Sequence, residues 1–342
     1  AITGLINLLE TELGPYLDDL LLEQILGDKV SETFEYANKQ FNVRFEASNN
    51  HPFGFDVFKK DYTHWIDNYD FVRLGDDSFY NVNVISTQKD NDSSRVKVVL
   101  VDSAQQTNLS SIVFKLKGSE TPLNLSVDEI TIPALPSKKD AIIYAYHNGN
   151  KIGKLTLKTF KLKERKVVVV PVNCTVSLDE TTLATSLNDI YKQGVTHWDV
   201  KLSQTWTNTS WDSLTPGLLE VAQDVTLMNK YSPEMRALRK AYFKDNDSID
   251  KNADYIFIVD GFTNSALDGY MVIGKGMGFV KNKANGSELS QTIAHELGHG
   301  AFGLRHEFDE IGEGTSNRLM DYAASTHLCV AEWKEIHSFL PD

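Results

Sequence analysis

The spacing of hydrophobic residues changes along the chain. Near the N-terminus, apolar residues recur at helical intervals, as Ile2, Leu5 and Leu9 show. From about residue 40 the interval becomes two, which is typical of strands with one buried face. The pattern therefore predicts a helical segment over residues 1–39 and a β domain over residues 40–165.

The predicted β domain contains several short alternating runs. Two of them are Phe41–Phe45 and Tyr80–Val84, in which every second residue is apolar. Asn148-Gly149 lies between two further runs, and this pair favours a type I′ turn in a β-hairpin. We expect an antiparallel β domain, for which an immunoglobulin-like sandwich is one form, closed by the polar run at residues 161–166.

Beyond this run, strands alternate with helices. Val167–Val172 is continuously apolar, as in a strand buried on both faces. The pattern predicts a mixed sheet in a domain over residues 166–342, so the fold class of the whole chain is α+β. The predicted strands are Val167–Val172, Trp198–Leu202, Tyr255–Val259 and Tyr270–Val280, and the predicted helices are Thr181–Gln193, one that starts at Ser232-Pro233, one capped by Ser287, and Ser325–Phe339.

Composition narrows the choice of partners. The chain has 342 residues, of which 41% are apolar, and a formal net charge of −13. This acidic excess argues against nucleic acid or anionic lipid as the main partner. No apolar run approaches the ~18 residues of a membrane span. The sequence opens at Ala1 with no visible signal peptide, so we expect a piece of a longer chain.

The chain has two cysteines, Cys174 and Cys329. Cys329 shares a helical stripe with Trp333 and Ile336, which predicts a buried thiol. Two cysteines do not make a disulfide framework, and the sequence leaves open whether they pair.

Residues 295–299 carry an HExxH motif, in which two histidines are four residues apart. On a helix, His295 and His299 lie on one face, so both imidazoles can reach one metal ion. Glu296 can reach a water on that ion without being a ligand. The same helix has an apolar stripe that includes Ile293 and faces away from the two histidines.

A third ligand is expected soon after the motif. Gly303 can end the helix in a left-handed turn and send the chain back, which would deliver His306. Glu307, Asp309 and Glu310 are the alternatives if His306 does not return to the site.

A calcium site is a separate expectation from three acidic residues, Asp245, Asp247 and Asp250. The glycine and the terminal glutamate of an EF-hand loop are missing there, so a solvated loop is the other interpretation.

The motif and its surroundings resemble a known family. HELGHGAFGLRH at residues 295–306, followed by LMDY at residues 319–322, resembles the metzincin clan of zinc peptidases. That clan has HExxHxxGxxH and a methionine-containing turn, the Met-turn, beneath the zinc. The predicted order of elements is also similar, from the first strand through the active-site helix to a C-terminal helix. Here Gly300, Ala301 and Phe302 separate His299 from Gly303, where the clan has two residues.

The resemblance implies roles for further residues. It assigns His295, His299 and His306 to one catalytic Zn²⁺ and Met320 to the Met-turn. Tyr322 would ligate zinc or stabilise the transition state, as in the astacin and serralysin branches. A protein or peptide substrate would lie extended along the edge strand. The resemblance also implies a secreted or extracellular protein.

These observations predict a zinc-dependent endopeptidase with Glu296 as the general base. One alternative is a secreted toxin or effector module that uses the same chemistry on a target-cell protein. Another is a non-catalytic zinc-containing binding or adhesion module, against which the presence of Glu296 argues. The role of residues 1–165 stays open, and an inhibitory prosegment with Asp56 on the zinc is one candidate.

Overall fold

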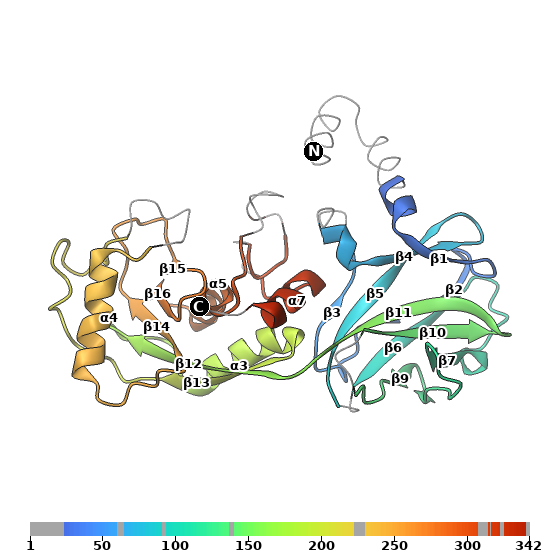
Figure 1. The fold of residues 1–342 in the computed structure, drawn as a ribbon, viewed down its shortest axis with the longest axis horizontal. Helices are drawn as coiled ribbons and strands as arrows, with labels where there is room; N and C mark the ends of the chain where they lie inside the picture. Colours follow the sequence, from blue (N-terminus) through green and yellow to red (C-terminus); the bar gives the residue numbers. More distant parts are fainter. Residues whose placement is uncertain are drawn as a thin grey trace, which may run out of the picture. The chain divides into compact units, whose positions relative to one another are not determined.

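The computed structural model describes residues 24–59, 65–90, 94–136, 140–221, 230–306, 314, 316–321 and 325–339. The chain divides into two compact units, Ala1–Lys161 and Leu162–Asp342, which are drawn in Figure 1. The division falls four residues before the expected boundary at residue 165, because a strand of the second unit already begins at Lys163. Most of the predicted N-terminal helix lies outside the described residues.

The first unit is built from strands in two sheets. The larger sheet has the order β1-β4-β5-β11-β10-β7, with β3 paired to β5, and the smaller sheet has the order β2-β6-β9-β8. Apolar side chains from both sheets form one core, which includes Phe45, Val82, Val98 and Leu155. The strands are β1 (Val30–Phe34), β2 (Phe41–Glu46), β3 (Phe55–Asp56), β4 (Asp70–Leu74), β5 (Phe79–Gln88), β6 (Arg95–Asp102), β7 (Val113–Leu116), β8 (Leu125–Ser126), β9 (Glu129–Thr131), β10 (Ala141–His147) and β11 (Asn150–Phe160).

The expectation of an antiparallel domain is confirmed for most strand pairs of this unit but is wrong for two of them, which are parallel. The immunoglobulin-like form stays a prediction. β1 pairs parallel with β4, and β11 pairs parallel with β5. Strands β6 to β10 lie between β5 and β11 in sequence, which provides the long crossover that a parallel pair needs. Strand β1 lies within residues 1–39, for which a helical segment was predicted. That prediction is therefore wrong for residues 30–34.

The Asn148-Gly149 prediction is confirmed. β10 and β11 pair antiparallel on either side of it, and both turn residues have positive φ, 49° and 82°. A type I′ turn requires positive φ at both positions, and asparagine and glycine reach it at low cost.

The second unit has one five-stranded sheet with helices on both faces. The sheet order is β13-β12-β14-β16-β15, in which all neighbours are parallel except β15 and β16. The α+β class is therefore confirmed for the chain. The elements are β12 (Lys163–Pro171), α3 (Glu180–Tyr191), β13 (Thr196–Leu202), α4 (Pro233–Asp245), β14 (Asp254–Val259), β15 (Gly269–Met271), β16 (Met277–Lys281), α5 (Gly286–Phe302) and α7 (Val330–Ser338).

Three predicted boundaries in this unit are wrong. Residues 270–280 form two antiparallel strands instead of one, because the chain turns back through Gly274, whose φ is +70°. Helix α5 is capped by Asn285, whose side chain accepts from the N–H of Ser287, so Ser287 lies inside the helix. Helix α7 begins at Val330, five residues after the predicted start.

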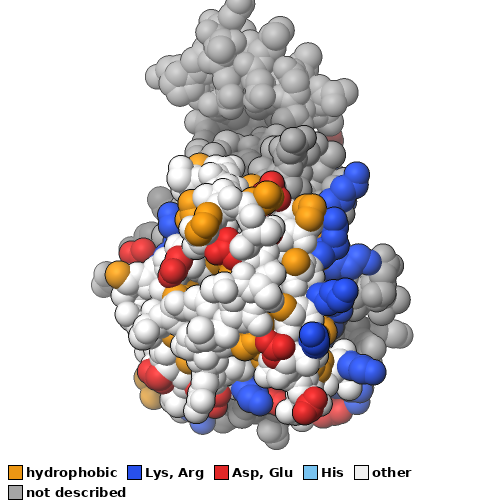
Figure 2. Space-filling model, turned by 90° about the vertical axis from the view of Figure 1, so that its left-hand side faces the viewer, with side chains coloured by type: hydrophobic (Ala, Val, Ile, Leu, Met, Phe, Trp, Pro, Cys, Tyr) orange, Lys and Arg blue, Asp and Glu red, His pale blue; other side chains and the backbone are white. Residues whose placement is uncertain are grey.

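The faces of the sheet carry different helices. α4 packs on one face, where Tyr242 lies 5.3 Å from Phe257 between ring centroids. Side chains alternate along β14, so Ile256 points to the other face. There α3 and α5 pack together, and α5 contacts β15 and β16. The end of the unit near α4 is shown in Figure 2, where Lys and Arg side chains gather in one column.

Both cysteines are buried and free, so no disulfide joins Cys174 to Cys329. The predicted burial of Cys329 is confirmed. Among the residues in the described ranges, no helix is long and apolar enough to span a membrane.

Candidate metal centre

Helix α5 carries the HExxH motif at its C-terminal end. Residues from Ile293 to Phe302 are buried without a break, so the motif is enclosed although its helix starts at the surface. The helix ends at Gly303, which has a φ of +73° and donates its N–H to the carbonyl of His299 over 3.0 Å. Leu304 donates in the same way to Gly298. The left-handed turn at Gly303 reverses the direction of the chain, and His306 follows three residues later.

The turn brings His306 beside the two motif histidines. The Nε2 atom of His306 lies 3.1 Å from that of His295 and 2.9 Å from that of His299. The remaining Nε2 distance, between His295 and His299, is 3.2 Å. The three residues therefore form a group that could hold a metal ion. The extra residue before Gly303 does not remove His306 from the site.

Two of the three imidazoles are oriented through their other ring nitrogen. His295 Nδ1 lies 2.8 Å from the carbonyl of Leu319, and His299 Nδ1 lies 2.6 Å from the carbonyl of Leu304. A carbonyl can only accept, so each Nδ1 carries the hydrogen and each Nε2 presents a lone pair to the centre. Such outer partners fix the ring orientation and the tautomer of metal-binding histidines.

Burial also keeps these rings in the form that binds metals. It lowers the pKa of His295, and it lowers the pKa of His299 further because both neighbouring histidines add to the effect. Burial with the charge of His295 lowers the pKa of His306 to about 3. All three imidazoles are therefore neutral at pH 7, and neutral imidazole is the ligating form.

Glu296 is a buried carboxylate at the same helix end, with 4% of its surface exposed. It accepts a hydrogen bond from the backbone of Met271, but burial raises its pKa well above the usual value. Its Oε2 atom has no hydrogen-bond partner among the described residues. A buried acceptor without a partner is costly and needs an explanation.

Gly269 makes room for this carboxylate at the start of the edge strand β15. A Cβ atom added at Gly269 would lie 2.3 Å from Glu296 Oε1. No side chain larger than hydrogen fits there unless the carboxylate moves. The strand backbone and Glu296 are therefore in direct contact.

Met320 lies beneath the helix that holds the two motif histidines. It is fully buried, and a Cβ atom added at Gly298 would come within 2.6 Å of its Sδ atom. Gly298 directly precedes His299, so the methionine packs against the helix turn that carries both motif histidines. The preceding carbonyl, that of Leu319, orients His295.

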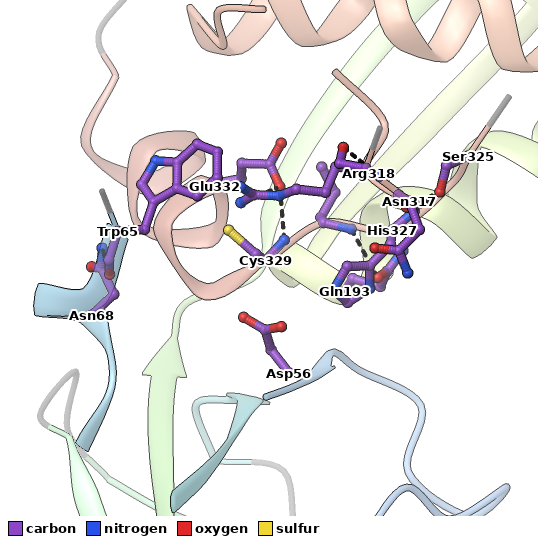
Figure 3. Close-up of polar contacts among 12 residues, drawn as sticks. Asp56, Trp65, Asn68, Gln193, Asn317, Arg318, Ser325, His327, Cys329 and Glu332 are labelled. Atoms are coloured by element: carbon purple, nitrogen blue, oxygen red, sulfur yellow. Dashed lines mark hydrogen bonds and ion pairs between the residues drawn. The ribbon is translucent and has the colours of Figure 1, made fainter. Parts of the chain in front are cut away.

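The turn around Met320 is fixed by an inner ion pair. Arg318 is fully buried and lies 3.4 Å from Glu332 of α7. Figure 3 shows both side chains. The same carboxylate oxygen accepts the N–H of Cys329 over 2.7 Å and caps α7. Helix α7 is thereby tied to the turn that orients His295.

Two glutamine side chains form hydrogen bonds with the backbone of residues 325–328, between the Met320 turn and α7. Gln193 donates to the carbonyl of Thr326 over 2.7 Å and accepts from the N–H of Leu328 over 3.1 Å. Gln291 of α5 donates to the carbonyl of Ser325 over 2.7 Å. These residues, like the Arg318–Glu332 pair and Gly269, escaped the sequence reasoning, because each acts on a partner far away in sequence.

Some of the predicted residues cannot be compared with the structure. Tyr322 lies outside the described residues, and so do the alternative ligands Glu307, Asp309 and Glu310. Asp321, just before Tyr322, is buried and accepts the N–H groups of two preceding residues.

The predicted calcium residues do not form a metal-binding group in the described part of the chain, where the histidine triad is the one such group. Asp245 accepts from Trp206 and Asn208, and Asp250 pairs with Lys166.

Asp56, the prosegment candidate, is buried within the first unit. Its Oδ2 atom accepts the hydroxyl of Tyr69 over 2.7 Å, and its Oδ1 atom accepts the N–H of Val57 over 2.9 Å. These bonds give the carboxylate a structural role within its own unit.

Comparison with known proteins does not assign a family. No protein-family model matches the chain, and no curated protein matches it. Among solved structures, a sialyltransferase from Photobacterium damsela is similar over 54% of this chain and 37% of that one, with 16% identity and a TM-score of 0.18. A likeness at that TM-score carries no argument about fold or activity.

Proposed function

We propose that this protein is a zinc-dependent metallopeptidase. The observation that carries the proposal is the convergence of three imidazole Nε2 atoms, two from the buried His295 and His299 and one from the half-buried His306, around one point where a cation would accept their lone pairs. Zinc with Zn–N bonds of about 2.0–2.1 Å and tetrahedral angles needs nitrogens about 3.3 Å apart. The distances of 2.9–3.2 Å are close to that spacing.

The donor set suits zinc and leaves room for catalysis. Three neutral imidazoles suit zinc, copper, iron or nickel, whereas calcium and magnesium prefer oxygen ligands. In catalytic zinc sites three protein ligands leave a fourth position for water or substrate. When bound, zinc would lower the pKa of a water and polarise the carbonyl of the substrate.

Glu296 is suited to move the protons of this reaction. It would accept a proton from the attacking water and deliver it to the leaving amine, for which a raised pKa is an advantage. Its unpartnered Oε2 atom is the acceptor available for that step. This arrangement favours an enzyme over a non-catalytic metal module, which has no use for a buried carboxylate without a partner.

Strand β15 supports a peptide substrate. It is the edge of the sheet, so one side of its backbone can pair with an extended peptide. Its first residue, Gly269, touches Glu296, which would bring a peptide on this strand close to the catalytic carboxylate. The order of elements, the Met320 turn and helix α7 also fit the metzincin resemblance of the sequence.

The proposal is tested with the purified chain and denatured casein. We expect cleavage that stops on treatment with a zinc chelator and returns when zinc is added back. Cobalt should restore activity as well, and its absorption spectrum reports the ligand geometry. A chain that takes up zinc at the triad but cleaves no member of a peptide library would contradict the peptidase proposal.

A further inference from the structure

The outer face of helix α4 is a ridge of positive charge. Arg236, Lys240 and Lys244 follow one another at intervals of four residues, and Arg239 lies beside them; all four are exposed. At 1.5 Å per residue the row spans about 12 Å. Figure 2 shows the column of Lys and Arg side chains at this end of the unit.

The acidic residues of the same helix do not neutralise this ridge. Glu234 is buried, and its carboxylate accepts three backbone N–H groups from the loop over residues 213–220. Asp245 accepts from Trp206 and Asn208. Both carboxylates are thus engaged in holding the unit together.

The four cations also form no ion pair with any residue that the structure describes. Arg236 donates to the carbonyl of Tyr231 over 2.6 Å, and the guanidinium of Arg239 lies 4.8 Å from the centre of the Phe243 ring. Neither contact removes charge. Like charges four residues apart weaken a helix, so the ridge is not explained by the stability of α4.

We propose that this ridge docks an acidic segment of a partner protein. The whole chain carries a net charge of −13, which repels long polyanions such as nucleic acid and extended anionic surfaces. A short acidic segment differs, because screening confines its interactions to about 8–10 Å. Within that range a short segment can lie along the four exposed cations of α4.

The docking surface is separate from the metal centre. α4 packs on the sheet face that carries Phe257, whereas α5 and its histidines lie on the opposite face. Occupation of the ridge therefore does not require metal, and the inference is independent of the peptidase proposal.

A fluorescent octaglutamate peptide, followed by anisotropy with the full chain, provides the test. Lys240→Glu would place an acid between Arg236 and Lys244, which creates two favourable pairs along the helix. We therefore expect peptide binding to weaken about tenfold or more while Tm stays unchanged or rises. Lys201→Glu, at an exposed position of the edge strand β13, is the control with the same change of net charge, and it should leave binding nearly unchanged.

The inference would be overturned if the native chain did not bind the peptide, or if both variants weakened binding equally. It would also be overturned if duplex DNA or phosphatidylserine vesicles bound through Lys240 while the peptide did not. For the native chain, we expect peptide binding to be lost when the salt concentration rises from 50 to 150 mM.

Discussion

In each unit, ionisable side chains gather around a buried one, but the charges of the two clusters are balanced differently. In the first unit, Lys154 is 2% exposed and lies 2.9 Å from Glu32 and 3.3 Å from Asp70, so positive and negative groups meet. In the second unit, the Nε2 atoms of three histidines converge around His299, 2.9–3.2 Å from one another. A matched cluster is costly to break on one side, because removal of one partner leaves an uncompensated charge. The unmatched cluster of imidazole lone pairs is the one that we propose holds a cation.

The largest expected effect in the second unit is the loss of peptide hydrolysis when the Glu296 carboxylate is removed. Glu296→Gln should lower peptide hydrolysis by about 10²–10⁴-fold, the range typical of general acid–base catalysis, while zinc content stays at one per chain. Activity assays combined with metal analysis check this. Retention of full activity in the variant would show that Glu296 is not the proton acceptor.

A second test concerns the ion pair that supports the Met320 turn. Glu332→Gln should weaken zinc binding about 10–100-fold, because it loosens the turn whose Leu319 carbonyl orients His295. Competition with a chromogenic chelator measures the affinity, and the cobalt spectrum reports ligand geometry. Glu335→Gln, on the same helix, is the control and should leave zinc affinity unchanged. An affinity equal to that of the native chain in both variants would exclude the positioning role.

The matched cluster should respond in stability rather than in metal binding. Lys154→Met removes the cation that Glu32 and Asp70 share, and we expect a loss of about 1–3 kcal/mol in the free energy of unfolding. Lys97→Met, which removes an exposed pair with Glu46, should cost less than about 1 kcal/mol. Urea unfolding of the full chain measures both values. Equal losses would place Lys154 among ordinary surface residues.

The smallest expected effect is the pH dependence of the stability that Glu32 contributes to this cluster. Burial alone would raise the pKa of Glu32, but hydrogen bonds from Lys151, Tyr144 and Lys154 outweigh it and lower the pKa from 4.5 to about 2. A carboxylate whose pKa is lower in the folded state stabilises the fold when the pH is above its unfolded pKa. This contribution is lost as the pH falls toward the folded pKa. The stability difference between the native chain and Glu32→Gln should therefore shrink between pH 4.5 and pH 2. A constant difference would contradict the assignment.

The candidate metal site was predictable where its geometry is local. The spacing of His295 and His299 on one helix and a glycine at the helix end suffice to place three imidazoles together, and the structure has them there. The supporting contacts were not predictable, since Gln193 and Glu332 reach partners more than ten residues away.

The same limit explains the errors in the fold. The hairpin at Asn148-Gly149 is a local signal and was predicted, whereas the parallel pairing of β5 with β11 depends on how distant strands meet. The prediction of a single strand over residues 270–280 is wrong, because the apolar residues on both sides of Gly274 fit one strand as well as two strands joined by a turn.

The central claim is that His295, His299 and His306 together bind one zinc ion. Titration of the metal-free chain with zinc at neutral pH, in the native form and in His306→Ala, tests it most directly, with His197→Ala as an exposed control. We expect one equivalent to bind to the native chain and to His197→Ala, and the affinity of His306→Ala to fall by more than the 10–100-fold of an outer-shell change. Uptake of no zinc, or an unchanged affinity in His306→Ala, would contradict the account.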